Sequence, residues 1–384
     1  MSLEQLLSKH RVVVCVGCGG VGKTTTAASL AVHAAMRGRR VLCLTIDPAK
    51  RLANSLGLAE MTTEEQVVPA ELFAQHGLVL RGSLSAMMLD TKRTFDDLVV
   101  RYASSPEVAE RILKNRVYQY LSTSLAGTQE YMAMEKLHAV RQDGRYDLIV
   151  LDTPPTSNAL DFLDAPERLA GLVDSPAMRW FIQAFEGAGK LSFNLIGKGA
   201  AFLLRGLSRF TGTGFLEVVA QFVTDFNDLF GGFRERARQV AEALRSPEVA
   251  FVIVTSPSPL AMEEAIFFAR RLEEAGMRRD AFVINGMRPL FAEPAVDDRA
   301  LAREIAPHVP NPERAVERMR RALDDARTRA IADRVQADRL RQRAGAEHLF
   351  VEVPAFEEDV HDLAALAEVA AYLTGERSMP TVVS

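Results

Sequence analysis

The sequence has few cysteines and no long apolar run. Its three cysteines, Cys15, Cys18 and Cys43, all lie near the beginning of the 384-residue chain. No stretch approaches the roughly 20 uninterrupted apolar residues of a membrane-spanning helix, so we expect no integral membrane segment. The residues from Met1 to His10 are too polar for a secretory leader. These absences predict a cytoplasmic protein with reduced thiols.

An excess of charge of one sign is also missing. The 46 basic and 50 acidic side chains give a net charge of −4, which argues against a protein that binds nucleic acid through a broad basic surface. A hydrophobic share of 48% allows a large core. The length suggests roughly two or three domain-sized units.

Cys15 and Cys18 stand at the C-x-x-C spacing that also occurs in zinc and redox sites. A tetrahedral zinc site requires further ligands, and no second such pair follows in the sequence. Cys15 is also expected inside a buried strand. We therefore expect neither zinc nor an iron–sulfur cluster.

A glycine-rich segment carries the main functional signal. Residues 17–25 read G-C-G-G-V-G-K-T-T directly after the apolar run 12–16, and they match the pattern G-x-x-x-x-G-K-[ST]. Glycines allow the backbone N–H groups to surround phosphate oxygens. Lys23 is expected to reach the β- and γ-phosphates, and the Thr24 hydroxyl to bind Mg²⁺. The predicted nucleotide-binding residues of this loop are Gly17, Cys18, Gly19, Gly20, Val21, Gly22, Lys23, Thr24 and Thr25. The alternative is a turn that only packs a helix on a strand.

Two later apolar runs each end in an aspartate. Residues 41–46 lead to Asp47, and residues 146–151 lead to Asp152. Ligands bind at the carboxyl edge of strands in open α/β sheets, which is where both carboxylates are expected. Asp152 is a candidate to support Mg²⁺ through water or through the Thr24 hydroxyl. Alone, either aspartate is equally compatible with a helix cap or a turn.

These segments resemble a known family, the arsenite-pump and tail-anchored-protein-targeting ATPases, which are deviant phosphate-loop (Walker A) ATPases. The loop 17–25, the segment 44–49 (L-T-I-D-P-A) and the segment 152–156 (D-T-P-P-T) carry the resemblance. The segments 160–163, 283–286 (V-I-N-G) and 351–354 (V-E-V-P) agree with it. We find no internal repeat, so the duplicated form of the arsenite-pump ATPase is not present.

The resemblance implies roles for individual residues. Asp47 would orient or deprotonate the attacking water in switch I. Switch II, which senses the γ-phosphate, would consist of Asp152, Thr153, Pro154, Pro155 and Thr156. Asn285 would hydrogen-bond the adenine, and the loop from Pro354 to Phe356 would flank the base. A turn at the end of a strand is the alternative for Asn285.

Two departures from the family pattern matter. Family members usually have a lysine at the second loop position, where it crosses the dimer interface, but this chain has Cys18. We therefore expect slow hydrolysis, or another cation in its place; Lys50 and Arg51 are nearest in sequence. Ser157 and Asn158 stand where the targeting members tend to have glycine and histidine, which puts the coupling to a client site in doubt.

Two regions lie outside the nucleotide core. Residues 165–244 are rich in apolar residues, with Val219, Phe222, Phe226, Phe230 and Phe233 at helical spacing. This segment is either a groove for a hydrophobic client helix or an ordinary helical core or dimer contact; the resemblance favours the groove. Residues 297–345 mix both charges densely and predict solvated amphipathic helix without a clean basic patch.

The expected architecture is a doubly wound α/β core with a mostly parallel sheet and an inserted helical subdomain. The core would comprise about residues 1–164 and 245–384, with a helical insertion at about 92–142 and an apolar subdomain at 165–244. The expected function is a dimeric ATPase switch, homodimeric or paired with a related ATPase, in which Mg-ATP opens and closes a hydrophobic surface. A scaffold with little ATPase activity is the strongest alternative. The protein would be cytoplasmic, or peripheral to the membrane.

Other classes fit less well. A nitrogenase-reductase-like ATPase needs cluster cysteines after Cys43, and a septum-positioning ATPase normally ends in a basic membrane helix, whereas residues 362–373 are acidic. A plasmid-partition ATPase should present a basic DNA-binding surface. An arsenite-stimulated ATPase needs thiols at a metalloid site, but all three cysteines belong to the predicted strands and loop.

Overall fold

The computed structural model describes most of the chain in two compact units. The described residues are 2–46, 51–60, 62–116, 118–119, 122, 128–153, 222, 225, 235–236, 238–293, 297–345 and 348–379. The first unit draws its described residues from 1–88, 145–159 and 247–384, and the second from 89–144 and 160–246. The second unit therefore interrupts the first at two points of the chain. Most of the apolar segment 165–244 lies outside the described residues.

The first unit is built on one sheet. Within the described residues, eight strands pair in the order β3-β4-β2-β5-β1-β6-β7-β8. Every neighbouring pair is parallel except β3 and β4. The strands are β1 (Val12–Val16), β2 (Arg40–Thr45), β3 (Gln66–Val67), β4 (Ser83–Met88), β5 (Leu148–Asp152), β6 (Val249–Thr255), β7 (Ala281–Met287) and β8 (Leu349–Pro354). The central strands read as continuous apolar runs because parallel sheets are covered on both faces.

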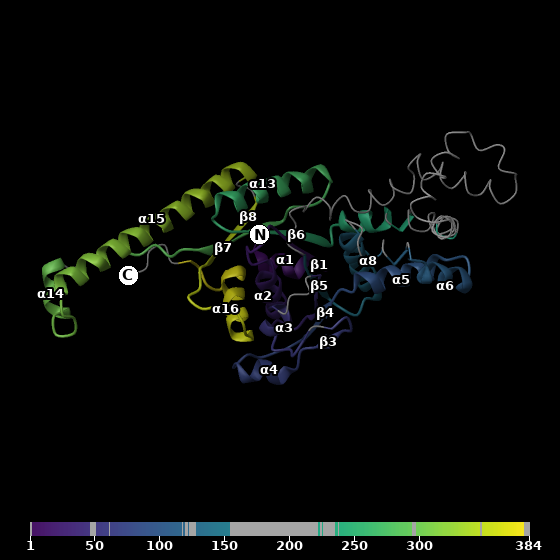
Figure 1. Ribbon diagram of the computed structural model, residues 1–384, viewed down its shortest axis with the longest axis horizontal. Coiled ribbons are helices and arrows are strands. Elements are labelled where there is room, and N and C mark those ends of the chain that lie inside the picture. The colour runs from purple at the N-terminus through teal and green to yellow at the C-terminus, as the bar shows by residue number, and fades with distance from the viewer. Residues whose placement is uncertain are drawn as a thin grey trace, which may run out of the picture. The chain divides into compact units, whose positions relative to one another are not determined.

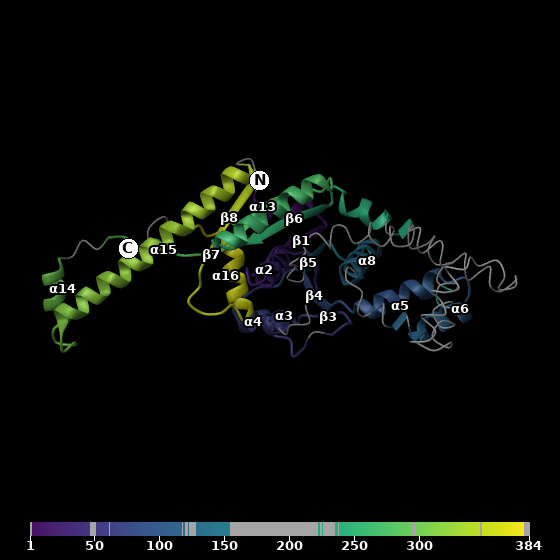
Figure 2. The ribbon, with the colours of Figure 1, turned by 45° about the horizontal axis from the view of Figure 1, so that its top comes forward.

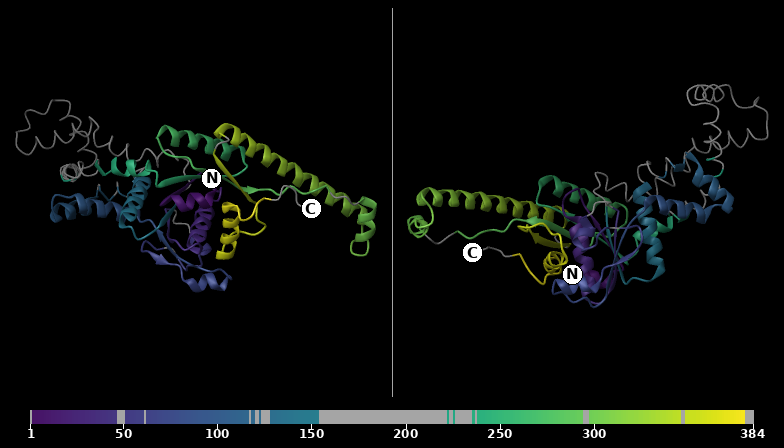
Figure 3. Two further views of the ribbon diagram at one scale, coloured as in Figure 1. Left: turned by 180° about the vertical axis from the view of Figure 1, so that it is seen from behind. Right: turned by 60° about the horizontal axis from the view of Figure 1, so that its bottom comes forward.

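Helices cover both faces of this sheet. The helices of this unit are α1 (Leu3–Lys9), α2 (Lys23–Met36), α3 (Arg51–Ser55), α4 (Ala70–Gln75), α13 (Pro259–Glu274), α14 (Asp298–Ile305), α15 (Pro312–Ala344) and α16 (Leu363–Thr374), and α14 packs against α15. Figures 1 and 2 show α2 and α16 on one side of the strands and α13 and α15 on the other, and Figure 3 shows the same division from behind. The predicted doubly wound, mostly parallel α/β fold is therefore confirmed.

Local sequence signals set several helix ends. Ser2 and Gln5 form a capping box that starts α1. Asp362 accepts a hydrogen bond from the Ala365 N–H and starts α16, which ends at Gly375 with a left-handed φ of 83°. The mixed-charge segment folds as α14 and the long α15, whose buried stripe includes Ala330, Ala337 and Leu340. In the described part of the chain, no helix is both long and apolar enough to cross a membrane.

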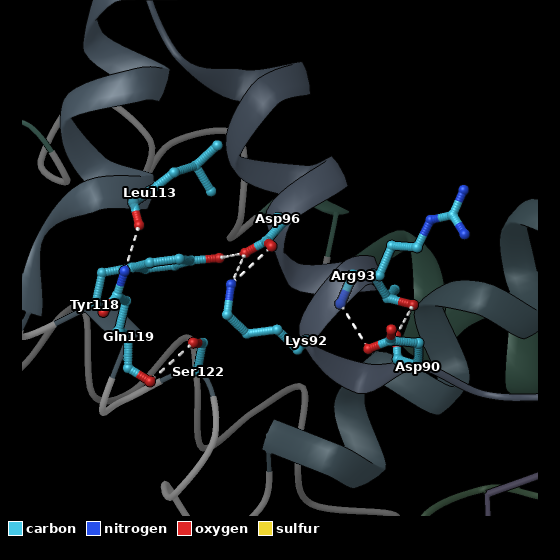
Figure 4. Close-up of polar contacts among 9 residues, drawn as sticks. Asp90, Lys92, Arg93, Asp96, Leu113, Tyr118, Gln119 and Ser122 are labelled. Carbon is cyan, nitrogen blue, oxygen red and sulfur yellow. Dashed lines mark hydrogen bonds and ion pairs between the residues drawn. The ribbon is translucent and has the colours of Figure 1, made fainter. Parts of the chain in front are cut away.

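The second unit is helical where it is described. It contains α5 (Thr91–Tyr102), α6 (Pro106–Lys114) and α8 (Thr128–Asp143). Tyr118 is fully buried and donates a hydrogen bond to Asp96 at 2.6 Å, while Lys92 bonds the same carboxylate (Figure 4). A buried ion pair joins Arg236 to Glu135, with N–O distances of 2.6 to 2.8 Å. The buried polar groups of Tyr118, Glu135 and Arg236 are thus paired, as burial requires.

Candidate functional site

The glycine-rich loop joins the central strand β1 to α2. β1 ends at Val16 and α2 begins at Lys23. A Cβ atom on Gly17 would lie 2.1 Å from the Val254 carbonyl oxygen of β6, so only glycine fits beside that strand. Gly22 precedes α2 with φ of +93°, and no side chain caps the helix. The first turn of α2 thus directs backbone N–H groups that no side chain caps, and its positive dipole end, at the loop.

Lys23 folds back over the loop. Its side chain is buried, and Nζ donates a hydrogen bond to the Cys18 carbonyl oxygen at 2.8 Å. The loop backbone and the ammonium group therefore surround the same small space. This is the arrangement that holds phosphate groups in other loops of this pattern.

Asp152 lies directly beside this loop at the end of β5. It is fully buried, and its Oδ2 accepts hydrogen bonds from the hydroxyls of Thr24 at 2.8 Å and Thr45 at 3.1 Å. Parallel pairing places Cys15 opposite Asp152. Burial raises the pKa of Cys15 well above its ordinary value, and the charge of Asp152 raises it further. Cys15 is therefore held as a neutral thiol.

A cavity of about 590 Å³ opens from the loop within the first unit. It is large enough for a nucleotide-sized ligand. Nine of the site residues predicted from the sequence line this cavity: Gly20, Gly22, Lys23, Thr24, Thr25, Thr153, Asn285, Pro354 and Phe356. The other residues that line the cavity are Asn54, Ser55, Gly286, Ala355, Glu358, Asp359, Val360, His361 and Val369. The structure thus brings together residues that the sequence separates by more than 300 positions.

The other predicted site residues divide into two groups. Gly17, Cys18, Gly19, Val21 and Asp152 are described but do not line the cavity. Asp47, Pro154, Pro155 and Thr156 lie outside the described residues, as do Lys50, Ser157 and Asn158.

Asn285 contacts the loop backbone. Its Nδ2 donates a hydrogen bond to the Val21 carbonyl oxygen at 2.9 Å. The same nitrogen would lie 2.2 Å from a Cβ atom on Gly22, which shows how closely the amide sits on the loop. Asn285 and Gly286 also line a second cavity of about 490 Å³, together with Gly20 and Val21 of the loop.

The segment that follows β8 forms the far wall of the larger cavity. Ala355 N–H donates to the Met287 carbonyl oxygen at 2.9 Å, and the Phe356 ring meets Tyr372 of α16 edge to face. Ser55 Oγ donates to the Val360 carbonyl oxygen at 3.3 Å and ties this segment to α3. The predicted base-flanking residues therefore belong to a wall that is anchored at several points.

Cys18 is half-buried against α13. Burial raises the pKa of its thiol, and the nearby Glu264 carboxylate raises it further. The loop position that usually carries a crossing lysine therefore faces an acidic side chain of the same chain. Sequence reasoning did not indicate this contact, because Glu264 belongs to no motif.

Sequence reasoning also missed Thr45 and the acidic end of the cavity. Thr45 appears in the sequence only as the last residue of a strand, and its contact with Asp152 requires knowledge of the strand order. Glu358, Asp359 and His361 also line the cavity. Their position directly after the Pro354 segment is the one feature of the sequence that could have indicated them. No group of three or more His, Cys, Asp or Glu side chains is placed to hold a metal ion in the part of the chain that the structure describes.

Comparison with known proteins agrees with this site. Residues 10–186 match the sequence model of the anion-transporting ATPases. ATPase get3 of Aspergillus terreus is 30% identical over 170 residues, which cover 43% of this chain and 46% of the relative. ATPase GET3 of Phaeosphaeria nodorum is 31% identical over 171 residues, which cover 43% of this chain and 48% of that relative. ATPase GET3 of Chaetomium globosum is 25% identical over 300 residues, which cover 77% of this chain and 78% of that relative.

The chain thus spans about half the length of the first two relatives and most of the third. The family match includes the loop 17–25, the strands β2 and β5, and the segment 152–156. The fold, the loop and these similarities agree, and residues 10–186 of this chain are similar to the anion-transporting ATPases.

Proposed function

We propose that this protein binds ATP with Mg²⁺ and hydrolyses it, and that its nucleotide state controls a hydrophobic surface. The observation that supports this proposal most directly is the hydrogen bond from Thr24 to Asp152. Thr24 and the neighbouring Lys23 both line the 590 Å³ cavity. The match of residues 10–186 to the anion-transporting ATPase model and the name ATPase on the relatives support the same activity.

The oxygen donors at this end of the cavity fit Mg²⁺. Thr24 gives its single hydroxyl proton to Asp152, so the hydroxyl oxygen keeps its lone pairs for a cation. Mg²⁺ prefers oxygen ligands and is commonly held by one or two protein groups together with water and substrate phosphates. When bound, the ion neutralises charge on the phosphates during transfer. Thr24 is the direct ligand, and Asp152 supports it.

The remaining roles concern the transferred phosphoryl group. Lys23 and the loop N–H groups of residues 17–25 hold the β- and γ-phosphates, because both lie at the N-terminal end of α2. Asp47 orients the attacking water, a role that rests on its place in the sequence. Asp152, Thr153, Pro154, Pro155 and Thr156 form the switch that responds to the γ-phosphate.

The base would lie beside Asn285, which also lines the cavity. Asn285 uses its amide nitrogen on the Val21 carbonyl, so its amide oxygen is left to accept a hydrogen bond. The 6-amino group of adenine is a donor of the required kind. Pro354 and Phe356 line the same cavity and would flank the base.

The partners of the switch follow from the family resemblance. The protein works as a homodimer, or as a heterodimer with a related ATPase, and a hydrophobic client helix binds the apolar segment 165–244. The GET3 name of its relatives supports this assignment to membrane-protein targeting. The Cys18 and Glu264 contact favours a second candidate, a nucleotide-binding scaffold with little turnover, because no cation stands at that loop position.

The first experiment separates nucleotide chemistry from the rest. ATP binding and phosphate release are measured with and without Mg²⁺ for the wild type, Lys23→Ala and the exposed-lysine control Lys9→Ala. We expect Lys23→Ala to lose both activities and Lys9→Ala to keep them. Equal phosphate release from Lys23→Ala and wild type would show that the loop is not the site.

The second experiment tests the switch. Oligomer mass and capture of a hydrophobic tail peptide are measured with and without Mg-ATP. We expect ATP to change at least one of them. If ATP binds but changes neither, the switch proposal is wrong and the ATP-binding proposal stands.

A further inference from the structure

We infer that Thr45 is a positioning residue that orients the Asp152 carboxylate, and through it the Thr24 hydroxyl, for Mg²⁺. This inference rests on the proposed ATPase function, in which Thr24 binds the ion. Thr45 itself touches neither nucleotide nor metal.

The sheet places the two side chains together. Thr45 is the last residue of β2, Asp152 is the last residue of β5, and the parallel register sets them directly opposite each other. Both are buried, with 1% and 0% of their surface exposed. Thr45 Oγ1 donates to Asp152 Oδ2 at 3.1 Å, and the Ile46 N–H reaches the Asp152 carbonyl oxygen at 3.4 Å.

The same carboxylate oxygen receives the proton of Thr24. Thr24 Oγ1 lies 2.8 Å from Asp152 Oδ2 and belongs to α2, whereas Thr45 belongs to β2. The terminal torsion of an aspartate is intrinsically broad, so each hydrogen bond from a rigid element restricts the orientation of the carboxylate further. Two donors from two rigid elements fix one orientation. Rigid support of this kind is what keeps metal ligands in a productive geometry.

The fixed carboxylate has a consequence for Thr24. A threonine hydroxyl has one proton, and when that proton is committed to Asp152 the lone pairs face away from the carboxylate. Loss of the Thr45 bond would allow the carboxylate to turn and the Thr24 hydroxyl to turn with it. Affinity for Mg²⁺ should then fall, while the loop contacts to the phosphates persist.

The test compares three variants of the full chain. Thr45→Val keeps the shape of the side chain and removes the hydroxyl, and Thr45→Ser keeps the hydroxyl and removes a methyl group. Thr255→Val is the matched control, since Thr255 is fully buried at the end of β6 and its hydroxyl bonds the Ser256 carbonyl oxygen instead.

Two readouts are used. A fluorescent ATP analogue is titrated in the presence of a chelator, which reports nucleotide binding without the metal. Mg²⁺ is then titrated, and the concentration that produces half of the metal-dependent change is recorded from analogue fluorescence and from melting temperature. Phosphate release is measured at each Mg²⁺ concentration as a supplement.

For Thr45→Val we expect the half-saturating Mg²⁺ concentration to rise about tenfold, the scale of one lost hydrogen bond to a charged acceptor, with metal-free binding unchanged. Thr45→Ser and Thr255→Val should behave like the wild type. The inference is overturned if Thr45→Val keeps the wild-type Mg²⁺ dependence, if Thr255→Val shifts equally, or if metal-free binding falls in parallel. A wild type that binds no analogue would instead remove the proposed function.

Discussion

Asn285 donates a hydrogen bond from Nδ2 to the Val21 carbonyl oxygen, 2.9 Å away, although 264 positions separate the two residues. The contact ties the end of β7 to the phosphate-binding loop. It also explains why the residue after Val21 is glycine, because any side chain there would meet the amide. The loop is thus shaped by a neighbouring strand as well as by its own glycines.

Gly22→Ala should destabilise the protein more than Gly20→Ala does. Both glycines have positive φ, of +93° and +78°, so both variants incur about 1–2 kcal/mol of backbone strain. A Cβ atom on Gly22 would collide with Asn285 Nδ2, whereas a Cβ atom on Gly20 meets nothing within 4 Å. Displacing Asn285 loses its hydrogen bond, worth about 1 kcal/mol more. Urea unfolding of both variants measures the difference, and equal losses would contradict the contact.

Cys18→Lys should speed phosphate release at saturating Mg-ATP, and more strongly when Glu264→Gln accompanies it. The Glu264 carboxylate lies close enough to raise the pKa of the Cys18 thiol, so an ammonium group at this position would pair with that carboxylate before reaching elsewhere. A cation delivered to the transferring phosphoryl group is worth about three to five orders of magnitude in rate in other systems. Cys18→Met is the control for side-chain size. Unchanged turnover in the double variant would show that this position does not limit hydrolysis.

Stability should fall as the pH drops below about 6.5, and His33 should contribute to the fall. Burial lowers the pKa of His33, and Arg37 lowers it further, whereas Glu376 and Glu4 raise it. A base whose pKa is lower in the folded state binds more protons when unfolded. The contribution of His33 to the free energy of unfolding is therefore complete above the pKa of the unfolded state. It is lost as the pH falls toward the pKa of the folded state.

The check is urea unfolding from pH 7.5 to about 5 for the wild type and His33→Gln. The variant should show a flatter pH dependence, since it removes the titrating group. His76 is an exposed histidine, and His76→Gln serves as the control. The same slope in His33→Gln and wild type would assign the pH dependence to other groups.

Glu135→Gln should destabilise the second unit strongly. Arg236 and Glu135 have side chains only 3% and 4% exposed, and removing one charge leaves the other buried without its partner. Breaking such a pair costs about 3–5 kcal/mol. Glu242→Gln is the matched control, because its pair with Arg238 is largely exposed, at 62% and 74%, and is worth at most about 1 kcal/mol. Urea unfolding followed by circular dichroism compares the two, and similar losses would contradict the difference in burial.

The fold was largely predictable because its signals are local. The apolar runs that became β1, β2 and β5, and the glycine-rich turn before α2, each indicate structure within a short window. Alternation of such strands with helices predicts a parallel sheet. The roles assigned to Asp47, Pro154, Pro155 and Thr156 stay predictions, because these residues lie outside the described part of the chain.

The sequence by itself determined the phosphate-binding loop, because Gly22, Lys23 and Thr24 are neighbours whose spacing already specifies their chemistry. Only the tertiary structure decided which side chains support that loop. The contacts of Asp152 with Thr45, of Asn285 with Val21 and of Glu264 with Cys18 join distant segments. Strand order and register create them, and neither is encoded in the spacing of any one motif.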